Sequence, residues 1–262
     1  MEQEIHPGLE KVCNFVKLKN SNQIKKLYES GFLYLENIID LEDCNKLVDD
    51  LNNLRGIYPY HLDDNKSYSG VFRSPFLSSN NYRDLLLHKE VHGYLNEIFP
   101  TNYQLHLSRC VENKATQIAA TIEWHRDIPY LHSPSKFPLC ISVLTFLSSC
   151  SEIQIEILKD SHDKKFYNFE DCEILRLNPK PGDALLFDSN LIHRTLPTAE
   201  TVFYNLYMFS SPVIKPVVDY SSNEVLRKIV SNQYRLSEVF NQIGYDFLVP
   251  KDDFEYLNKK IY

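Results

Sequence analysis

The sequence Glu123-Trp124-His125-Arg126-Asp127 places two side chains that can bind a metal ion at alternate positions. In an extended segment, alternate side chains project to the same side, so His125 and Asp127 would face one way and Arg126 the other. A second histidine from a distant strand would complete the set of two histidines and one carboxylate that holds non-heme Fe(II) and leaves coordination positions open for reactants. Because a His-x-Asp sequence alone often arises by chance, the prediction depends on that third ligand.

The candidate for the third ligand is His193, which follows a segment with clear turn and strand signals. The sequence 179–193 contains a Pro-Gly turn, then a short apolar run typical of a buried strand, and then a polar bend that would present the histidine. We therefore predict that His125, Asp127 and His193 bind a metal ion. We assign no catalytic residue beyond these ligands.

The elements that would position this set are helices followed by many short strands. Apolar residues at helical spacing predict a helix from Ser21 that Gly31 ends, a second from about residue 40 to 55, and a third over 82–99. Strands are predicted over 32–35, 69–72, 103–112, 117–125, 138–146, 153–158, 172–177, 184–187 and 202–209, with a strand or arm near 12–16 and helices over 223–230 and 233–243. Many short strands separated by turns indicate a sandwich or barrel.

Composition and length favour one soluble, β-rich domain. The chain has 262 residues, of which 43% are hydrophobic, and its 17 Tyr and 15 Phe favour a strand-rich interior. A net charge of -7 argues against a nucleic-acid partner. Six scattered cysteines without a CxxC pair, and the absence of a long apolar run, predict reduced thiols, no membrane partner and a cytoplasmic location.

Several segments, in order, resemble the phytanoyl-CoA dioxygenase-like family of Fe(II)/2-oxoglutarate-dependent oxygenases. Residues 27–40 resemble the opening helix, glycine and strand of that family, and Trp124-His125-Arg126-Asp127 resembles its metal motif. Residues 158–162 resemble its Pro-Gly-Ser-His turn without the proline and glycine, and residues 181–193 resemble the segment that bears the distal histidine. The resemblance covers about residues 22–212 and implies a double-stranded β-helix, a jelly-roll or cupin-like fold that is mainly β with flanking α-helices.

The domain organisation that follows is a single domain over residues 1–262, with N-terminal helices within 22–99 and a C-terminal helical tail over 213–262. The resemblance also implies Fe(II), 2-oxoglutarate as cosubstrate, O2 and a small-molecule substrate. Family members usually carry an arginine about ten residues past the distal histidine, which binds the distal carboxylate of 2-oxoglutarate. The corresponding residues 202–206 of this chain include no basic side chain.

Other residues would then have to hold the cosubstrate. Thr195 matches a hydroxyl position that the family uses near the same carboxylate, and Arg73 lies about where the family has another basic contact. Arg109 is on a predicted strand that should approach the metal. We expect Thr195, Arg73 and Arg109 to contact the cosubstrate, with Arg194 as a further candidate.

The reaction implied is hydroxylation or another oxidation of a small-molecule substrate, with release of succinate and CO2. The carboxylate at Asp127 favours hydroxylation or desaturation over halogenation, because halogenating relatives need that position vacant for a halide. The missing arginine leaves two alternatives open. One is an Fe(II)-dependent oxidase that does not use 2-oxoglutarate, and the other is a non-catalytic metabolite-binding protein on the same scaffold. Nearby arginines favour a small anionic or zwitterionic substrate.

Overall fold

The computed structural model describes residues 22–54, 70–99, 103–114, 123–127, 138–163 and 172–211. The elements along the chain are α2 (Asn22–Ser30), β1 (Phe32–Leu35), α3 (Leu41–Leu54), β2 (Gly70–Arg73), the short 3-10 helix η1 (Pro75–Leu77), α4 (Asn80–Leu86), α5 (Lys89–Ile98), β3 (Gln104–Asn113), β4 (Cys140–Phe146), β5 (Ile155–Leu158), β6 (Ile174–Leu177), β7 (Ala184–Asp188), β8 (His193–Thr195) and β9 (Val202–Ser210). The predicted arm near 12–16, most of the predicted strand over 117–125, and the C-terminal helical tail lie outside the described residues.

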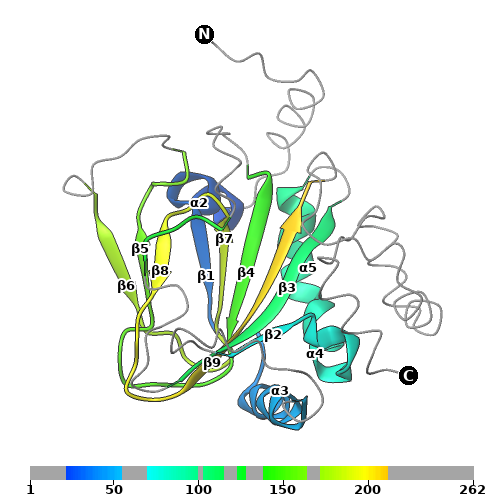
Figure 1. Cartoon of the computed structure of the whole chain (residues 1–262). Coiled ribbons are helices and arrows are strands. Elements are labelled where there is room, and N and C mark those ends of the chain that lie inside the picture. Colours follow the sequence, from blue (N-terminus) through cyan, green and yellow to red (C-terminus); the bar gives the residue numbers. More distant parts are fainter. Residues whose placement is uncertain are drawn as a thin grey trace.

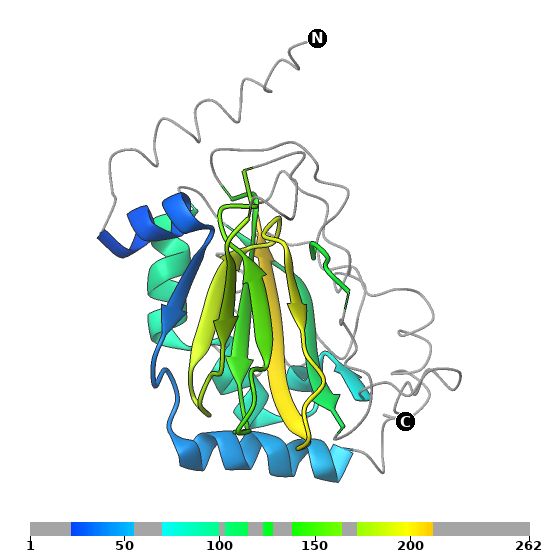
Figure 2. The ribbon, with the colours of Figure 1, turned by 90° about the vertical axis from the view of Figure 1, so that its left-hand side faces the viewer.

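The strands form two antiparallel sheets. The larger sheet has the order β1-β7-β4-β9-β3-β2, and the smaller has the order β6-β5-β8. Figure 1 shows the smaller sheet to one side of the larger, with α4 and α5 beside β2 and β3. Figures 1 and 2 both show α3 across one end of the larger sheet. This arrangement is the predicted double-stranded β-helix with flanking helices.

Two apolar clusters fill the two faces of the larger sheet. One packs α3 and α5 residues such as Leu51 and Leu95 against alternate strand residues such as Val143. The other packs Leu144 of β4 with Ile157 of β5, and so lies between the two sheets. We call the sheet face that carries this second cluster the inner face. Because strand side chains alternate between faces, the apolar residues of β4 and β7, and most of those of β9, divide between these two clusters.

One predicted element is different in the structure. The apolar pattern over 82–99 predicted a single helix, but the chain forms α4 and α5 with a break at Leu87 and His88. His88 has an extended backbone at ψ 118°, so the helical hydrogen bonds stop there and restart in α5. The break lets both segments bury their own apolar side chains, which a sequence pattern spanning both does not distinguish from one helix.

The first helix ends where the sequence indicates. Gly31 has φ +83°, a left-handed conformation that favours glycine, and its N–H donates to Leu27 O at 2.8 Å to close α2. The chain then enters β1, whose residues pair with β7 from Phe32 opposite Phe187 to Leu35 opposite Ala184. None of the helices in the described part of the chain has the length and apolarity needed to cross a bilayer.

Candidate metal centre

His125 and His193 are brought together by their own backbones. The N–H of His125 donates to His193 O, and the N–H of His193 donates to His125 O, each at 3.0 Å, so the two residues form an isolated antiparallel bridge. The N–H of Asp127 donates to Ser189 O at 3.0 Å, which attaches the same segment to the turn after β7. The polar bend predicted before His193 is this turn, where Leu191 N–H donates to Asp188 O at 2.7 Å.

The three predicted ligands converge on one point. Asp127 Oδ1 lies 3.9 Å from His125 Nε2 and 3.9 Å from His193 Nε2. One potential ligand atom from each of the three residues lies within 4.8 Å of the others, so the group could hold a metal ion. Among the residues that the structure describes, no other group of three such side chains has this geometry. The arrangement has two imidazoles and one carboxylate, which is the donor set of non-heme Fe(II) sites.

Both histidines have the same local hydrogen bond, which fixes their ring orientation. His125 Nδ1 lies 2.9 Å from Glu123 O, and His193 Nδ1 lies 3.0 Å from Leu191 O. A carbonyl oxygen only accepts, so each Nδ1 carries the proton and each Nε2 keeps its lone pair for a metal. The Phe187 ring also packs at a steep angle on His193, with centroids 4.7 Å apart.

The second oxygen of Asp127 has a different partner. Ser142 Oγ donates to Asp127 Oδ2 at 2.6 Å, and Ser142 Oγ lies 2.8 Å from Ser189 Oγ. Both serines are fully buried. The sequence analysis did not select either serine. The signal that could have found Ser142 is a small polar residue within the largely apolar, fully buried run of β4.

Electrostatics keep the site in the protonation state that a metal requires. Burial alone would raise the pKa of Asp127, but His193, the Arg109 guanidinium and the Ser142 hydrogen bond outweigh it, and the pKa lies below its usual value. Burial lowers the pKa of His193 to about 4. At neutral pH the site therefore presents a carboxylate and a neutral imidazole, as metal binding needs.

Arg109 is the predicted cosubstrate residue that the structure brings to the triad. Its Nη2 lies 4.0 Å from Asp127 Oδ1, and its Nε is buried and makes no hydrogen bond. The register places Arg109 opposite Leu206 of β9, on the inner face. A buried guanidinium nitrogen that lacks an acceptor fits an anionic group bound beside the metal.

The other two predicted cosubstrate residues are placed differently. Arg73 is directly opposite Arg109 in the β2–β3 pair and shares its face, but it is exposed at the sheet edge. Thr195 is buried in β8 opposite Ile155, and by alternation it lies on the same side of the strand as His193.

Arg194 and Trp124 turn away from the triad. Arg194 Nη2 lies 2.6 Å from Glu156 Oε2, and its guanidinium lies over the Trp124 ring at 4.5 Å from the centroid. Arg176 also pairs with Glu156, at 2.9 Å. Glu156, Arg176 and Arg194 therefore form an ion-pair cluster on the smaller sheet, and the Trp124 ring packs against its Arg194 guanidinium.

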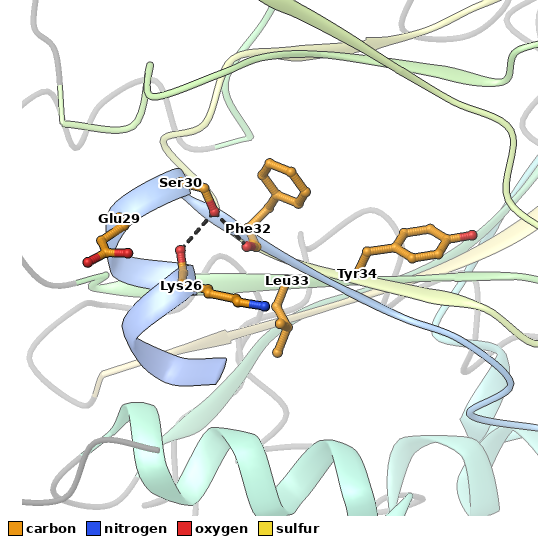
Figure 3. A pocket seen from close by; sticks show the side chains of 6 residues that line it. All are labelled: Lys26, Glu29, Ser30, Phe32, Leu33 and Tyr34. Carbon is orange, nitrogen blue, oxygen red and sulfur yellow. Dashed lines mark hydrogen bonds between the residues drawn. The ribbon is translucent and has the colours of Figure 1, made fainter. Parts of the chain in front are cut away.

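Residues 202–206, where the family usually has its arginine, include no basic side chain. On β9 the inner-face residues are Tyr204, Leu206 and Met208, which belong to the cluster between the two sheets. A surface pocket elsewhere is lined by α2 and β1 residues, including Lys26, Ser30 and Tyr34, and by none of the triad residues (Figure 3). Ser30 Oγ lies there 2.8 Å from Lys26 O and 3.0 Å from Phe32 O, so this hydroxyl contacts both the end of α2 and the start of β1.

Comparison with known proteins agrees with this geometry. A family model described as phytanoyl-CoA dioxygenase (PhyH) matches residues 27–200. A comparison with curated protein sequences finds no match.

Solved structures that are similar in fold include two enzymes of nogalamycin biosynthesis. The epimerase SnoN, a non-heme alpha-ketoglutarate-dependent enzyme from nogalamycin biosynthesis, has a TM-score of 0.60 at 10% identity, covering 72% of this chain and 82% of its own. The carbocyclase SnoK, also alpha-ketoglutarate-dependent and from the same biosynthesis, has a TM-score of 0.59 at 10% identity, covering 74% of this chain and 85% of its own. SnoN has also been solved with Fe3+, alpha-ketoglutarate and nogalamycin RO. The family match spans most of the chain and includes all three converging side chains, and the chain therefore belongs to the phytanoyl-CoA dioxygenase family of Fe(II)- and 2-oxoglutarate-dependent dioxygenases.

Proposed function

We propose that the protein uses Fe(II) and 2-oxoglutarate to hydroxylate or otherwise oxidise a small-molecule substrate. In the hydroxylation form, substrate, O2 and 2-oxoglutarate give hydroxylated substrate, succinate and CO2. The observation that carries the proposal is the convergence of Asp127 Oδ1 with His125 Nε2 and His193 Nε2. Iron bound there would supply the redox chemistry that couples decarboxylation of the cosubstrate by O2 to oxidation of the substrate.

The donor types of the three residues fit this ion. His125, Asp127 and His193 would hold it, because the carbonyl contacts at both Nδ1 atoms leave each Nε2 as the metal-binding nitrogen and the pKa of Asp127 lies below its usual value. The Phe187 ring and the apolar cluster between the two sheets limit access of water from the β7 side of His193. Exclusion of water by apolar side chains lowers the local dielectric constant and so strengthens the electrostatic interactions made inside the site.

Arg109 is the residue that we propose to bind a carboxylate of 2-oxoglutarate. Its buried Nε has no hydrogen-bond partner, and its Nη2 is 4.0 Å from a metal-binding oxygen. A planar guanidinium matches a carboxylate with two parallel hydrogen bonds. Thr195 supports the same role from β8 because it is buried on the His193 side of the strand. Arg73 is proposed as a further contact because it shares the inner face with Arg109.

One observation favours a second candidate. The inner face of β9 has Tyr204, Leu206 and Met208 and no basic residue. The distal carboxylate of 2-oxoglutarate, if it bound against β9, would therefore have no cation from this strand beside it. An Fe(II)-dependent oxidase that takes its electrons from the substrate alone would need no such cation. It would consume O2 without forming succinate.

Anaerobic titration of the metal-free protein separates these candidates. Fe(II) is added first and 2-oxoglutarate second, while the weak visible charge-transfer band of the bidentate complex is recorded. A saturating band supports the 2-oxoglutarate-dependent reaction. Iron binding without a band favours the oxidase, and a failure of iron to bind contradicts both.

A further inference from the structure

We propose that Ser142 is a positioning residue that restricts Asp127 to a single metal-binding oxygen and so keeps a coordination position open for the cosubstrate. The inference rests on the proposed function, because it concerns the same metal centre. It assigns a role to a side chain that is not itself a metal ligand.

The two carboxylate oxygens of Asp127 have different environments. Oδ1 is 3.9 Å from the Nε2 atom of each histidine, so it points to the centre of the triad. Oδ2 accepts the Ser142 hydroxyl at 2.6 Å. A carboxylate can bind a metal through one oxygen or through both, and this hydrogen bond occupies one of the two lone pairs of Oδ2 and holds that oxygen toward Ser142.

A second serine holds Ser142 in this orientation. The hydroxyls of Ser142 and Ser189 are 2.8 Å apart, and because Ser142 donates to Asp127, the hydrogen bond between the serines is donated by Ser189. Ser189 also accepts the Asp127 backbone N–H through its carbonyl oxygen, at 3.0 Å. Asp127 is thus fixed at its backbone by Ser189 and at its side chain by Ser142.

The surroundings make this arrangement difficult to break. Ser142 has no exposed surface, and the strand register places it between Phe187 and Met208 on the inner face. The Asp127 side chain is only 4% exposed. Rotating the carboxylate would remove a charge-assisted hydrogen bond where little water is available to replace it.

The consequence is a defined number of vacant metal positions. With one atom from each of three residues, a bound iron would keep coordination positions open for 2-oxoglutarate and O2. A carboxylate that bound through both oxygens would take one of these positions. Ser142 would then control affinity for the cosubstrate more than affinity for the metal.

The test compares three variants of the full chain with wild type. Ser142→Ala removes the hydroxyl, and Ser142→Thr retains it. Ser108→Ala is the control: it removes a buried hydroxyl of β3 that makes no hydrogen bond and lies on the face of the larger sheet opposite to the inner face. Iron affinity and then 2-oxoglutarate affinity are measured anaerobically through the charge-transfer band, with melting temperatures to show that each variant is folded. We expect Ser142→Ala to keep near wild-type iron affinity, because all three ligands remain. It should lose about tenfold or more in affinity for 2-oxoglutarate, because the second Asp127 oxygen can then take a position that the cosubstrate needs.

Ser142→Thr should restore most of the cosubstrate affinity, and Ser108→Ala should match wild type in both measurements. The inference is overturned if Ser142→Ala binds 2-oxoglutarate as wild type does, or if iron and 2-oxoglutarate affinities fall together. If wild type itself binds no iron, the proposed function fails and the inference fails with it. The two failures can be told apart. Failure of the proposed function shows in wild type, whereas failure of the inference alone shows only in Ser142→Ala.

Discussion

His125 and His193 exchange two backbone hydrogen bonds of 3.0 Å, and their rings lie with centroids 4.4 Å apart. The pairing of two distant chain segments therefore sets the spacing of two metal-binding nitrogens before any metal binds. Because each ring is also held at Nδ1 by a carbonyl oxygen, little side-chain freedom remains to be lost on binding.

Replacing Asp127 with Asn should remove metal binding without unfolding the protein. The change keeps the shape of the side chain but removes the negative charge, so iron affinity should fall by at least about 10- to 100-fold. Metal should raise the melting temperature of wild type and not of the variant. Glu123→Gln is the control, because it removes an exposed carboxylate from the same segment. Equal iron affinity in Asp127→Asn and wild type would refute the triad.

Replacing Arg109 with Gln should weaken 2-oxoglutarate binding and spare the metal. A charge-assisted hydrogen bond contributes about 1.5–3 kcal/mol, so the affinity for 2-oxoglutarate should fall about 10- to 100-fold. Arg176→Gln is a matched control, because Arg176 pairs with Glu156 on the smaller sheet and is 58% exposed. Band titration of the iron-loaded proteins gives both affinities. A normal affinity in Arg109→Gln would exclude Arg109 from the cosubstrate site.

Stability should fall in mild acid because of His106. Burial lowers its pKa to about 4, below the value near 6.5 of an unfolded chain, so between these pH values the unfolded state binds more protons. The stabilisation is complete above about pH 6.5 and decreases as the pH falls toward 4, by about 2 kcal/mol between pH 7 and pH 5. Urea unfolding of wild type and His106→Leu at the two pH values measures it. The variant should lose less stability over this interval, and an equal loss would contradict the assignment.

Replacing Gly182 with Ala should destabilise the fold. Gly182 has φ +92°, and an added Cβ would clash with Ile39 O, the carbonyl of the chain segment after β1. Strain of this kind costs on the order of 1–3 kcal/mol. Gly93→Ala is the opposite control: nothing lies within 4 Å of its Cβ position in α5, and the change should stabilise by up to about 1 kcal/mol. Thermal or urea unfolding compares them, and a neutral Gly182→Ala would show that the turn can relax.

The sequence determined the features that depend on short-range pattern. Runs rich in apolar and aromatic residues indicated the long strands β3, β4 and β9, and glycine at position 31 ended the first helix. The spacing of His125 and Asp127 specified that two ligands share a side, because side chains alternate along an extended chain. The turn, strand and bend signals of residues 179–193 added His193 as the third candidate. Each of these inferences needed only residues close together in the chain or a known motif.

The tertiary structure decided what depends on distant segments. The break between α4 and α5 was hidden because both halves have apolar residues at helical spacing. No local pattern indicates that Arg109 reaches Asp127 while Arg194 pairs with Glu156, because strand pairing and register choose between two arginines of equal chemistry. The role of Ser142 could not be predicted from the sequence for the same reason. Its hydroxyl acquires a role only where β4 brings it to a carboxylate from another segment, and burial then makes that hydrogen bond hard to replace with water.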